Sequence, residues 1–137
     1  MDVREIQSFF ESQGPDVLAA YLFGSRANGT ATPWSDVDIG IVLNPAHRLD
    51  ARARFSLRID LTRELMRSLR WNDVDVVILN DGPPALAATV LAEGTLLLCH
   101  DARRLQDFAR DVQLRAADLK PFLQRMQTRL LARLRAT

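Results

Sequence analysis

The 137-residue sequence contains one cysteine, Cys99. No internal disulfide can form, and a metal site built from several cysteine ligands is excluded. A reducing cytoplasm is therefore the expected location. Long apolar runs are also missing, since stretches such as Val17 to Phe23 are far too short to span a membrane. The N-terminal Met-Asp-Val-Arg-Glu starts no apolar segment, so no secretory signal is expected.

A strong basic excess is lacking as well. Residues 1–100 hold 9 Arg against 13 Asp or Glu, a balance of −4, and residues 101–137 hold 9 Arg or Lys against 4 Asp, a balance of +5. A protein that grips a long nucleic acid needs many cations on its binding surface, so no stable nucleic-acid complex is expected. The basic tail either meets an acidic partner or RNA, or is the solvated face of an amphipathic helix.

What is present is the pattern of one small α/β (α+β) domain, with 47% apolar residues. Short apolar runs bounded by turn residues predict strands, and longer runs with apolar positions three or four apart predict helices. The expected strands cover 17–23, 37–43, 73–79 and 95–99, and the expected helices follow Asp2 and cover 50–70 and 85–93. Alternating strands and helices favour a small mixed sheet with helices mainly on one face.

The tail predicts a helical extension, residues 101–137, packed on a domain of residues 1–100. Apolar positions from Leu105 to Leu130 step by three and four and form one stripe. Pro121 interrupts this stripe, which predicts two helices, the second capped by Asp118. The stripe from Phe108 through Leu130 is either a face that docks a partner or a face that packs on the chain's own sheet.

Three polar features are placed at the ends of the predicted strands. Gly24-Ser25 follows the first strand directly, Asp36-Val37-Asp38 opens the second after ten further residues, and Asp75 lies inside the third. Strand side chains alternate sides, so Asp36 and Asp38 share one face. Two such carboxylates can hold a hard divalent cation, with Asp75 as a third ligand. A metal ion or solvent must face them, because burying uncompensated charges is prohibitive.

The neighbouring residues fit phosphate chemistry. Two metal ions can grip the attacking and leaving oxygens of an in-line displacement at phosphorus. Gly24 lets the backbone approach a phosphate closely, and the Ser25 hydroxyl can bind its oxygens. Asp73 has the same strand parity as Asp75 and is the alternative third ligand, but it lies at the mouth of the strand, where a turn or capping role is expected. Asp75 is therefore favoured.

The ordered string Gly24-Ser25, ten residues, then Asp36-x-Asp38 and a strand with one further aspartate resembles the signature of DNA polymerase β-like nucleotidyltransferases. The fuller strings, Leu22 to Gly29 and Ser35 to Ile39, resemble the minimal nucleotidyltransferases (MNT proteins). These occur in prokaryotes as antitoxins of HEPN-domain ribonuclease toxins. The resemblance covers residues 17 to about 98 well and the tail more loosely.

The resemblance implies roles for the matching residues. Asp36 and Asp38 would bind two Mg²⁺ ions, and Asp75 would bind the catalytic ion and help to activate the attacking hydroxyl. Gly24 and Ser25 would hold the triphosphate of ATP. Arg26 would neutralise phosphate charge or pair with a local carboxylate.

The short chain leaves little surface to enclose an acceptor, so a partner that is itself the acceptor would supply the missing positioning. The leading hypothesis is transfer of AMP from ATP to a tyrosine hydroxyl of a cognate HEPN toxin, within a hetero-oligomer of the two proteins. One alternative is a nucleotidyltransferase that acts on a small molecule or an RNA end. Another is a non-catalytic antitoxin that masks its partner by binding.

Overall fold

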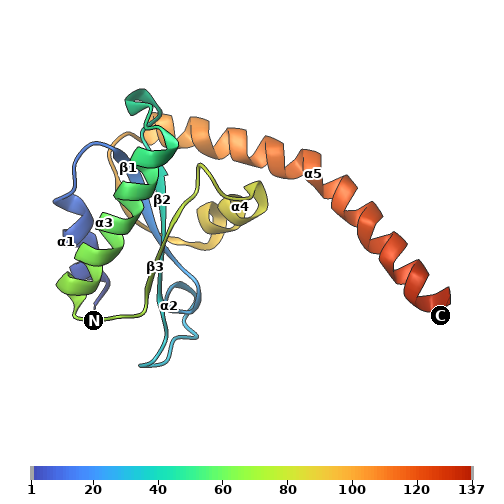
Figure 1. Cartoon of the computed structure of the whole chain (residues 1–137), viewed down its shortest axis with the longest axis horizontal. Coiled ribbons are helices and arrows are strands. Elements are labelled where there is room, and N and C mark those ends of the chain that lie inside the picture. The colour runs from blue at the N-terminus through green and yellow to red at the C-terminus, as the bar shows by residue number, and fades with distance from the viewer. Residues whose placement is uncertain (1, 137) are drawn as a thin grey trace.

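A computed structural model describes the backbone of residues 2–136 and the side chains of this range except 118–127, 130, 131 and 134–136. In chain order the elements are α1 (Val3–Glu11), β1 (Val17–Phe23), α2 (Ser25–Asn28), β2 (Val37–Leu43), a 3₁₀ turn (Pro45–His47), α3 (Ala51–Leu69), β3 (Val74–Ile78), α4 (Pro84–Glu93), β4 (Thr95–Cys99) and α5 (Ala102–Ala136) (Figure 1). No helix within the described residues is both long and apolar enough to cross a membrane.

The four strands form one mixed sheet in the order β3-β2-β1-β4. Strand β1 is antiparallel to both of its neighbours, whereas β2 and β3 are parallel and are joined by the crossover helix α3. The strand that is apolar throughout, β1, lies in the interior of the sheet, and only its last residue, Phe23, is not buried. The mixed sheet predicted from the sequence is confirmed.

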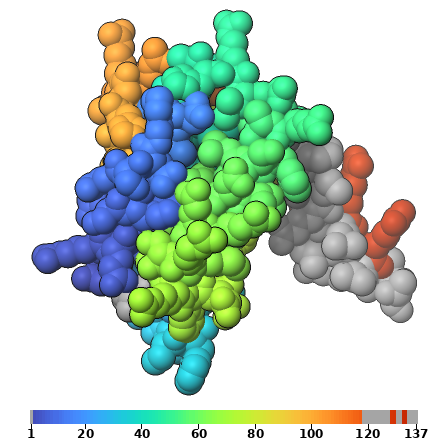
Figure 2. Space-filling model, turned by 60° about the vertical axis from the view of Figure 1, so that its left-hand side comes forward, coloured from blue at the N-terminus to red at the C-terminus, as the bar shows by residue number. Residues whose placement is uncertain are grey.

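Helices cover both faces of this sheet. One face, which includes Val37, Ile39 and Ile41, packs on α1 and α3, and Figure 2 shows α1 (blue) alongside α3 (green) on that side. The other face, which includes Val42, packs on α4 and on the start of α5 through Val112. The sequence pattern predicted helices mainly on one face of the sheet. Helices pack on both faces because β1 presents apolar side chains to each of them, and both sets of side chains have to be buried.

Local signals in the sequence set the ends of the crossover helix. The Asp50 carboxylate accepts a hydrogen bond from the Ala53 backbone N–H at 2.8 Å, which satisfies one of the free donors at the start of α3. At the other end Arg70 adopts a left-handed conformation with φ of 53°. The chain then returns through Trp71 to the start of β3, which places β3 directly beside β2.

The tail differs from the prediction. Helix α5 runs without interruption from Ala102 to Ala136, so the prediction of two helices separated at Pro121 and capped by Asp118 was wrong. An interior proline removes one hydrogen bond and crowds one carbonyl, and the long runs of helix on both sides sustain the remaining bonds. Leu105, Phe108 and Val112 pack against the α4 face of the sheet. The apolar positions predicted beyond these, at Leu119, Leu123, Met126 and Leu130, lie outside the described side chains.

Candidate active site

Asp38 and Asp75 are register partners on the parallel strands β2 and β3. Partners in a parallel pair project to the same side of the sheet, so the two carboxylates are neighbours on one face. On its other side Asp38 is paired with Phe23, the last residue of β1. Asp38 therefore lies between the end of β1, where the Gly24-Ser25 turn begins, and Asp75.

Gly24 is required by its conformation and by its neighbour. Its φ is +75°, in the region that disfavours residues with a side chain. A Cβ added at this position would lie 2.5 Å from an Oδ atom of Asp38, a separation that real Cβ atoms do not show. The absence of a side chain at Gly24 thus lets the backbone of the turn approach the Asp38 carboxylate closely. The Gly24-Ser25 turn and Asp38, which are separate in the sequence motif, are therefore neighbours in space.

The pKa of Asp38 reflects the presence of the other two predicted aspartates. Burial raises the pKa of Asp38 above its ordinary value of 3.8, and the carboxylates of Asp75 and then Asp36 raise this pKa further. Both effects disfavour the charged form of Asp38, because a carboxylate loses hydration on burial and repels like charges nearby. The acidic group that faces Asp38 from β3 is Asp75, which supports Asp75 over Asp73 as the third member of the site.

The residues of the Gly24-Ser25-Arg26 turn have different surroundings. The Ser25 hydroxyl makes no hydrogen bond to any described residue, so it is available to a ligand. Arg26 instead donates from Nε and from one terminal nitrogen to the Ser35 carbonyl, at 3.1 and 2.6 Å. Its guanidinium also lies over the ring of Trp71, 5.6 Å from the centroid. Arg26 therefore ties α2 to the residue before Asp36 and to the segment leading into β3.

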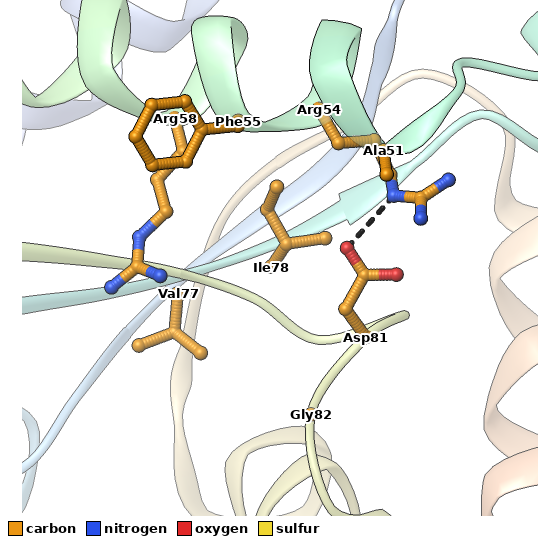
Figure 3. Close-up of a pocket in the computed structure, with 8 residues that line it drawn as sticks. All are labelled: Ala51, Arg54, Phe55, Arg58, Val77, Ile78, Asp81 and Gly82. Carbon is orange, nitrogen blue, oxygen red and sulfur yellow. Dashed lines mark hydrogen bonds and ion pairs between the residues drawn. The ribbon is translucent and has the colours of Figure 1, made fainter.

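Arg58 is a neighbour of the site that sequence reasoning missed. From α3 it extends across the edge strand β3 toward Val77, as Figure 3 shows, and its guanidinium lies 3.7 Å from an Oδ atom of Asp75. It lines a cavity of about 300 Å³ between α3 and β3, where Arg54 pairs with Asp81 at 2.9 Å. No motif marks this contact, because it joins residues 17 positions apart through tertiary packing.

The acidic residues suit a hard divalent cation, which prefers carboxylate oxygens. The half-buried Asp38 is destabilised in its charged form by Asp36 and Asp75, and a cation would relieve that repulsion. Across the described part of the chain, however, no three Asp, Glu, His or Cys side chains are gathered closely enough to chelate an ion. The three aspartates are neighbours, and Asp75 pairs with Arg58.

A mixed sheet with a glycine-serine turn beside aspartates on two adjacent strands is the architecture of a nucleotidyl-transfer domain. The sequence profile described as "Polymerase beta, Nucleotidyltransferase" matches residues 4–103, and the chain belongs to this family. No curated protein sequence gives a significant match.

Solved structures extend the similarity to the tail. A toxin–antitoxin crystal structure with AMP-PNP contains a chain that is 26% identical with a TM-score of 0.76, over 96% of this chain and 99% of that chain. A mutant of the MntA–HpeT toxin–antitoxin gives 25% identity and a TM-score of 0.74, over 96% and 98%. A complex of the tri-AMPylated Shewanella oneidensis HEPN toxin with its MNT antitoxin gives 24% and 0.68, over 94% and 95%.

Proposed function

We propose that this chain is the antitoxin of a HEPN-domain toxin and that it inactivates its partner by transferring AMP from ATP to a tyrosine hydroxyl. The observation that carries the proposal is the register of Asp38 opposite Asp75, with Gly24 packed against the Asp38 carboxylate. This arrangement brings the predicted cation ligands to the predicted phosphate-binding turn. The proposed reaction takes place in the cytoplasm, where ATP is abundant and the single Cys99 stays reduced.

Each acidic residue has a role in this proposal. Asp36 and Asp38 would hold two Mg²⁺ ions, and Asp75 would be a further ligand of one of them in place of its contact with Arg58. Bound Mg²⁺ supplies electrostatic stabilisation of the charge that develops on the phosphate oxygens. A carboxylate oxygen of Asp75 accepts the proton of the tyrosine hydroxyl. The tyrosine oxygen then bonds to the α-phosphorus of ATP while the bond to the leaving diphosphate breaks.

The turn holds the triphosphate. The backbone of Gly24 can approach a phosphate because no side chain intervenes, and the free Ser25 hydroxyl donates to a phosphate oxygen. Arg26 contributes positive charge nearby. Two of its five N–H groups bind the Ser35 carbonyl, and the others remain for a phosphate oxygen. Arg26 therefore positions the loop before Asp36 and neutralises phosphate charge.

A protein acceptor can reach the site at an open edge of the sheet. Asp75, the residue proposed to activate the acceptor hydroxyl, lies on the edge strand β3 with 60% of its side chain exposed. A docked partner whose own tyrosine enters the site would supply orientation and proximity. The similar chain crystallised with AMP-PNP in a toxin–antitoxin complex matches this one over nearly its full length, tail included, which supports a toxin as the partner and a hetero-oligomer as the assembly. The Shewanella oneidensis complex, in which an MNT antitoxin is bound to an AMPylated HEPN toxin, supports the choice of a HEPN toxin.

The proposal is tested by incubating the full chain with ATP, Mg²⁺ and the HEPN protein encoded beside it, with intact-mass spectrometry as the readout. The partner is expected to gain the mass of one or more AMP groups, and peptide mapping is expected to place them on tyrosine. Asp36→Asn and Asp38→Asn should abolish the gain, while Asp60→Asn, on the exposed side of α3, should not. An unmodified partner at saturating ATP would overturn the proposal.

A second candidate is a non-catalytic antitoxin that masks its partner by binding. The observation on its side is that Asp75, a predicted cation ligand, pairs with Arg58. Growth rescue from the toxin separates the two functions. Rescue that survives Asp36→Asn and Asp38→Asn together would favour masking, whereas loss of rescue in a chain that still binds the toxin would favour transfer.

A further inference from the structure

A second cavity adjoins the proposed site on the α4 side of the sheet. It encloses about 200 Å³ between α2 and α4, and Gly24, the residue that touches the Asp38 carboxylate, forms part of its wall. Its walls are mainly apolar, with a few polar groups among them, which is the composition of a small-molecule site. Its apolar lining includes Phe23 and Val90, and its polar lining includes Asn28, Thr89 and Glu93.

Two of the polar side chains that line this cavity have hydrogen-bonding atoms without a partner among the described residues. Among the described residues the Glu93 carboxylate has neither a hydrogen bond nor an ion pair. The Asn28 side-chain oxygen accepts from the Thr30 N–H and hydroxyl, at 3.1 and 2.6 Å, which leaves its amide N–H₂ free to donate. The cavity therefore offers one strong acceptor and one donor to whatever occupies it.

Glu93 is also placed where it does not help its own helix. It is the last residue of α4, and that helix has no basic residue in its last turn. A negative charge at the C-terminus of a helix lies against the negative end of the helix dipole and destabilises it. Helix stability therefore does not account for an acid at this position. The Glu93 side chain is exposed and lines the cavity, where a ligand with a hydrogen-bond donor can reach it.

We propose that this cavity receives the base of the nucleoside triphosphate and that Glu93 selects adenine. The inference rests on the proposed function, which places the triphosphate at Gly24 and Ser25. Because Gly24 borders both the acidic cluster and the cavity, a nucleotide whose phosphates lie at the turn has its base directed between α2 and α4, against Phe23 and Val90.

Adenine has the matching edge. Along one edge its exocyclic amine donates beside the ring nitrogen N7, which accepts. Glu93 accepts from the amine, and the free amide of Asn28 donates to N7. Guanine and hypoxanthine have the same N7 but carry a carbonyl oxygen in place of the amine, so an acceptor faces the Glu93 carboxylate and leaves it without a donor on this edge.

The test compares binding of ATP and inosine triphosphate to the full chain with Mg²⁺, by isothermal titration calorimetry. The unaltered chain is expected to bind ATP about tenfold more tightly, the effect of one hydrogen bond to a charged group. Glu93→Gln should remove this preference, because a glutamine amide can turn to accept from the amine or donate to the carbonyl. Glu64→Gln, a matched exposed glutamate on α3, should keep it.

A second variant tests the cavity independently of hydrogen bonding. Thr89 is exposed on α4, and its hydroxyl bonds only within that helix, to the Ala85 carbonyl at 3.0 Å. Thr89→Trp should fill the cavity without disturbing the core and weaken binding of both nucleotides about tenfold.

The outcomes separate the inference from the function on which it rests. Unchanged preference in Glu93→Gln, together with unchanged ATP affinity in Thr89→Trp, would place the base elsewhere and overturn the inference while nucleotide binding stands. A chain that binds no nucleoside triphosphate in the presence of Mg²⁺ would contradict the proposed function itself.

Discussion

Strands β2 and β3 carry the same residue type at the same register position, yet they place it in different surroundings. Asp38, on the interior strand β2, is half-buried and repelled by its neighbours, so its pKa is raised. Asp75, on the edge strand β3, has 60% of its side chain exposed and pairs with Arg58. Position in the sheet, rather than residue type, decides which carboxylate is held under electrostatic strain.

This difference suggests a division of labour. A carboxylate fixed beside Gly24 and flanked by like charges is a pre-positioned cation ligand whose charge a metal stabilises. A carboxylate at an exposed edge can exchange one cationic partner for another at little energetic cost, because exposed ion pairs are weak. Under the proposed function Asp38 is the fixed ligand and Asp75 the exchangeable one.

The largest expected effect is on activity. Asp38→Asn should lower AMP transfer to the HEPN partner by about a hundredfold to a thousandfold, as is typical when a preorganised electrostatic group is removed from a transfer site. The rate of transfer of labelled AMP, measured under single-turnover conditions, gives the size of this decrease. Asp60→Asn is the control, since Asp60 is an exposed aspartate on α3. Transfer by Asp38→Asn at the rate of this control would remove Asp38 from the site.

The same substitution should change stability in the opposite direction. An unfolded aspartate titrates near its ordinary value of 3.8, and the pKa of Asp38 in the folded chain is higher. Between these values the folded state holds more protons than the unfolded state, so stability falls as pH rises through that window. Asp38→Asn removes this loss of stability, because asparagine does not titrate. Its melting temperature should exceed that of the unaltered chain at pH 7, and the two should converge at acid pH.

Next in size is the effect of a side chain at the turn. Gly24→Ala should lower the free energy of unfolding by about 1–3 kcal/mol, because it combines a positive φ with a clash against Asp38. Gly29→Ala is the matched control, since Gly29 has a φ of +81° and open space around it. Urea unfolding of both variants separates the clash from the backbone strain. Equal losses would mean that Gly24 does not press on the carboxylate.

Much of this architecture is predictable from the chain alone. The bounds of β1 and β2 follow from apolar runs that end at Gly24 and Asn44, and α3 follows from the Asp50 cap and a long stretch without glycine or proline. These signals are local, and the sequence shows them directly. The pairing of Asp36-x-Asp38 with Asp75 came from strand parity together with a family resemblance, and the register supports it.

The remaining features depend on contacts that no short pattern encodes. Arg26 bonds to a carbonyl nine residues away and lies over Trp71, and Arg58 reaches around an edge strand. Both depend on how α2 and α3 sit against the sheet. The sequence predicted a break in the C-terminal helix because a proline is a strong local signal for a helix end. Helix α5 is nevertheless uninterrupted, because the helical hydrogen bonds on both sides of Pro121 outweigh the bond that the proline removes.

Asp75→Asn gives a direct contrast with Asp38→Asn. It should also reduce AMP transfer, but its free energy of unfolding at pH 7 should change by less than about 0.5 kcal/mol, because the side chain is largely exposed. Urea unfolding of the two variants in parallel makes the comparison. A stabilisation equal to that of Asp38→Asn would show that the edge carboxylate carries the same strain as the interior one.

The smallest expected effect concerns Arg58. Arg58→Gln removes the cation that competes for Asp75, so Mn²⁺ should bind up to about fivefold more tightly, the range of a weak exposed ion pair. Arg63→Gln, another exposed arginine on α3, should bind Mn²⁺ like the unaltered chain. Weaker binding in Arg58→Gln than in this control would show that Arg58 supports the cation site rather than competing with it.

The central claim, that aspartates from two adjacent strands share a divalent cation beside the Gly24 turn, is tested most directly by counting free Mn²⁺ with electron paramagnetic resonance during titration of the nucleotide-free chain. The unaltered chain and Asp60→Asn should show the same saturable binding, and Asp36→Asn, Asp38→Asn and Asp75→Asn should each weaken it. Binding in Asp38→Asn that equals binding in the unaltered chain would contradict the claim.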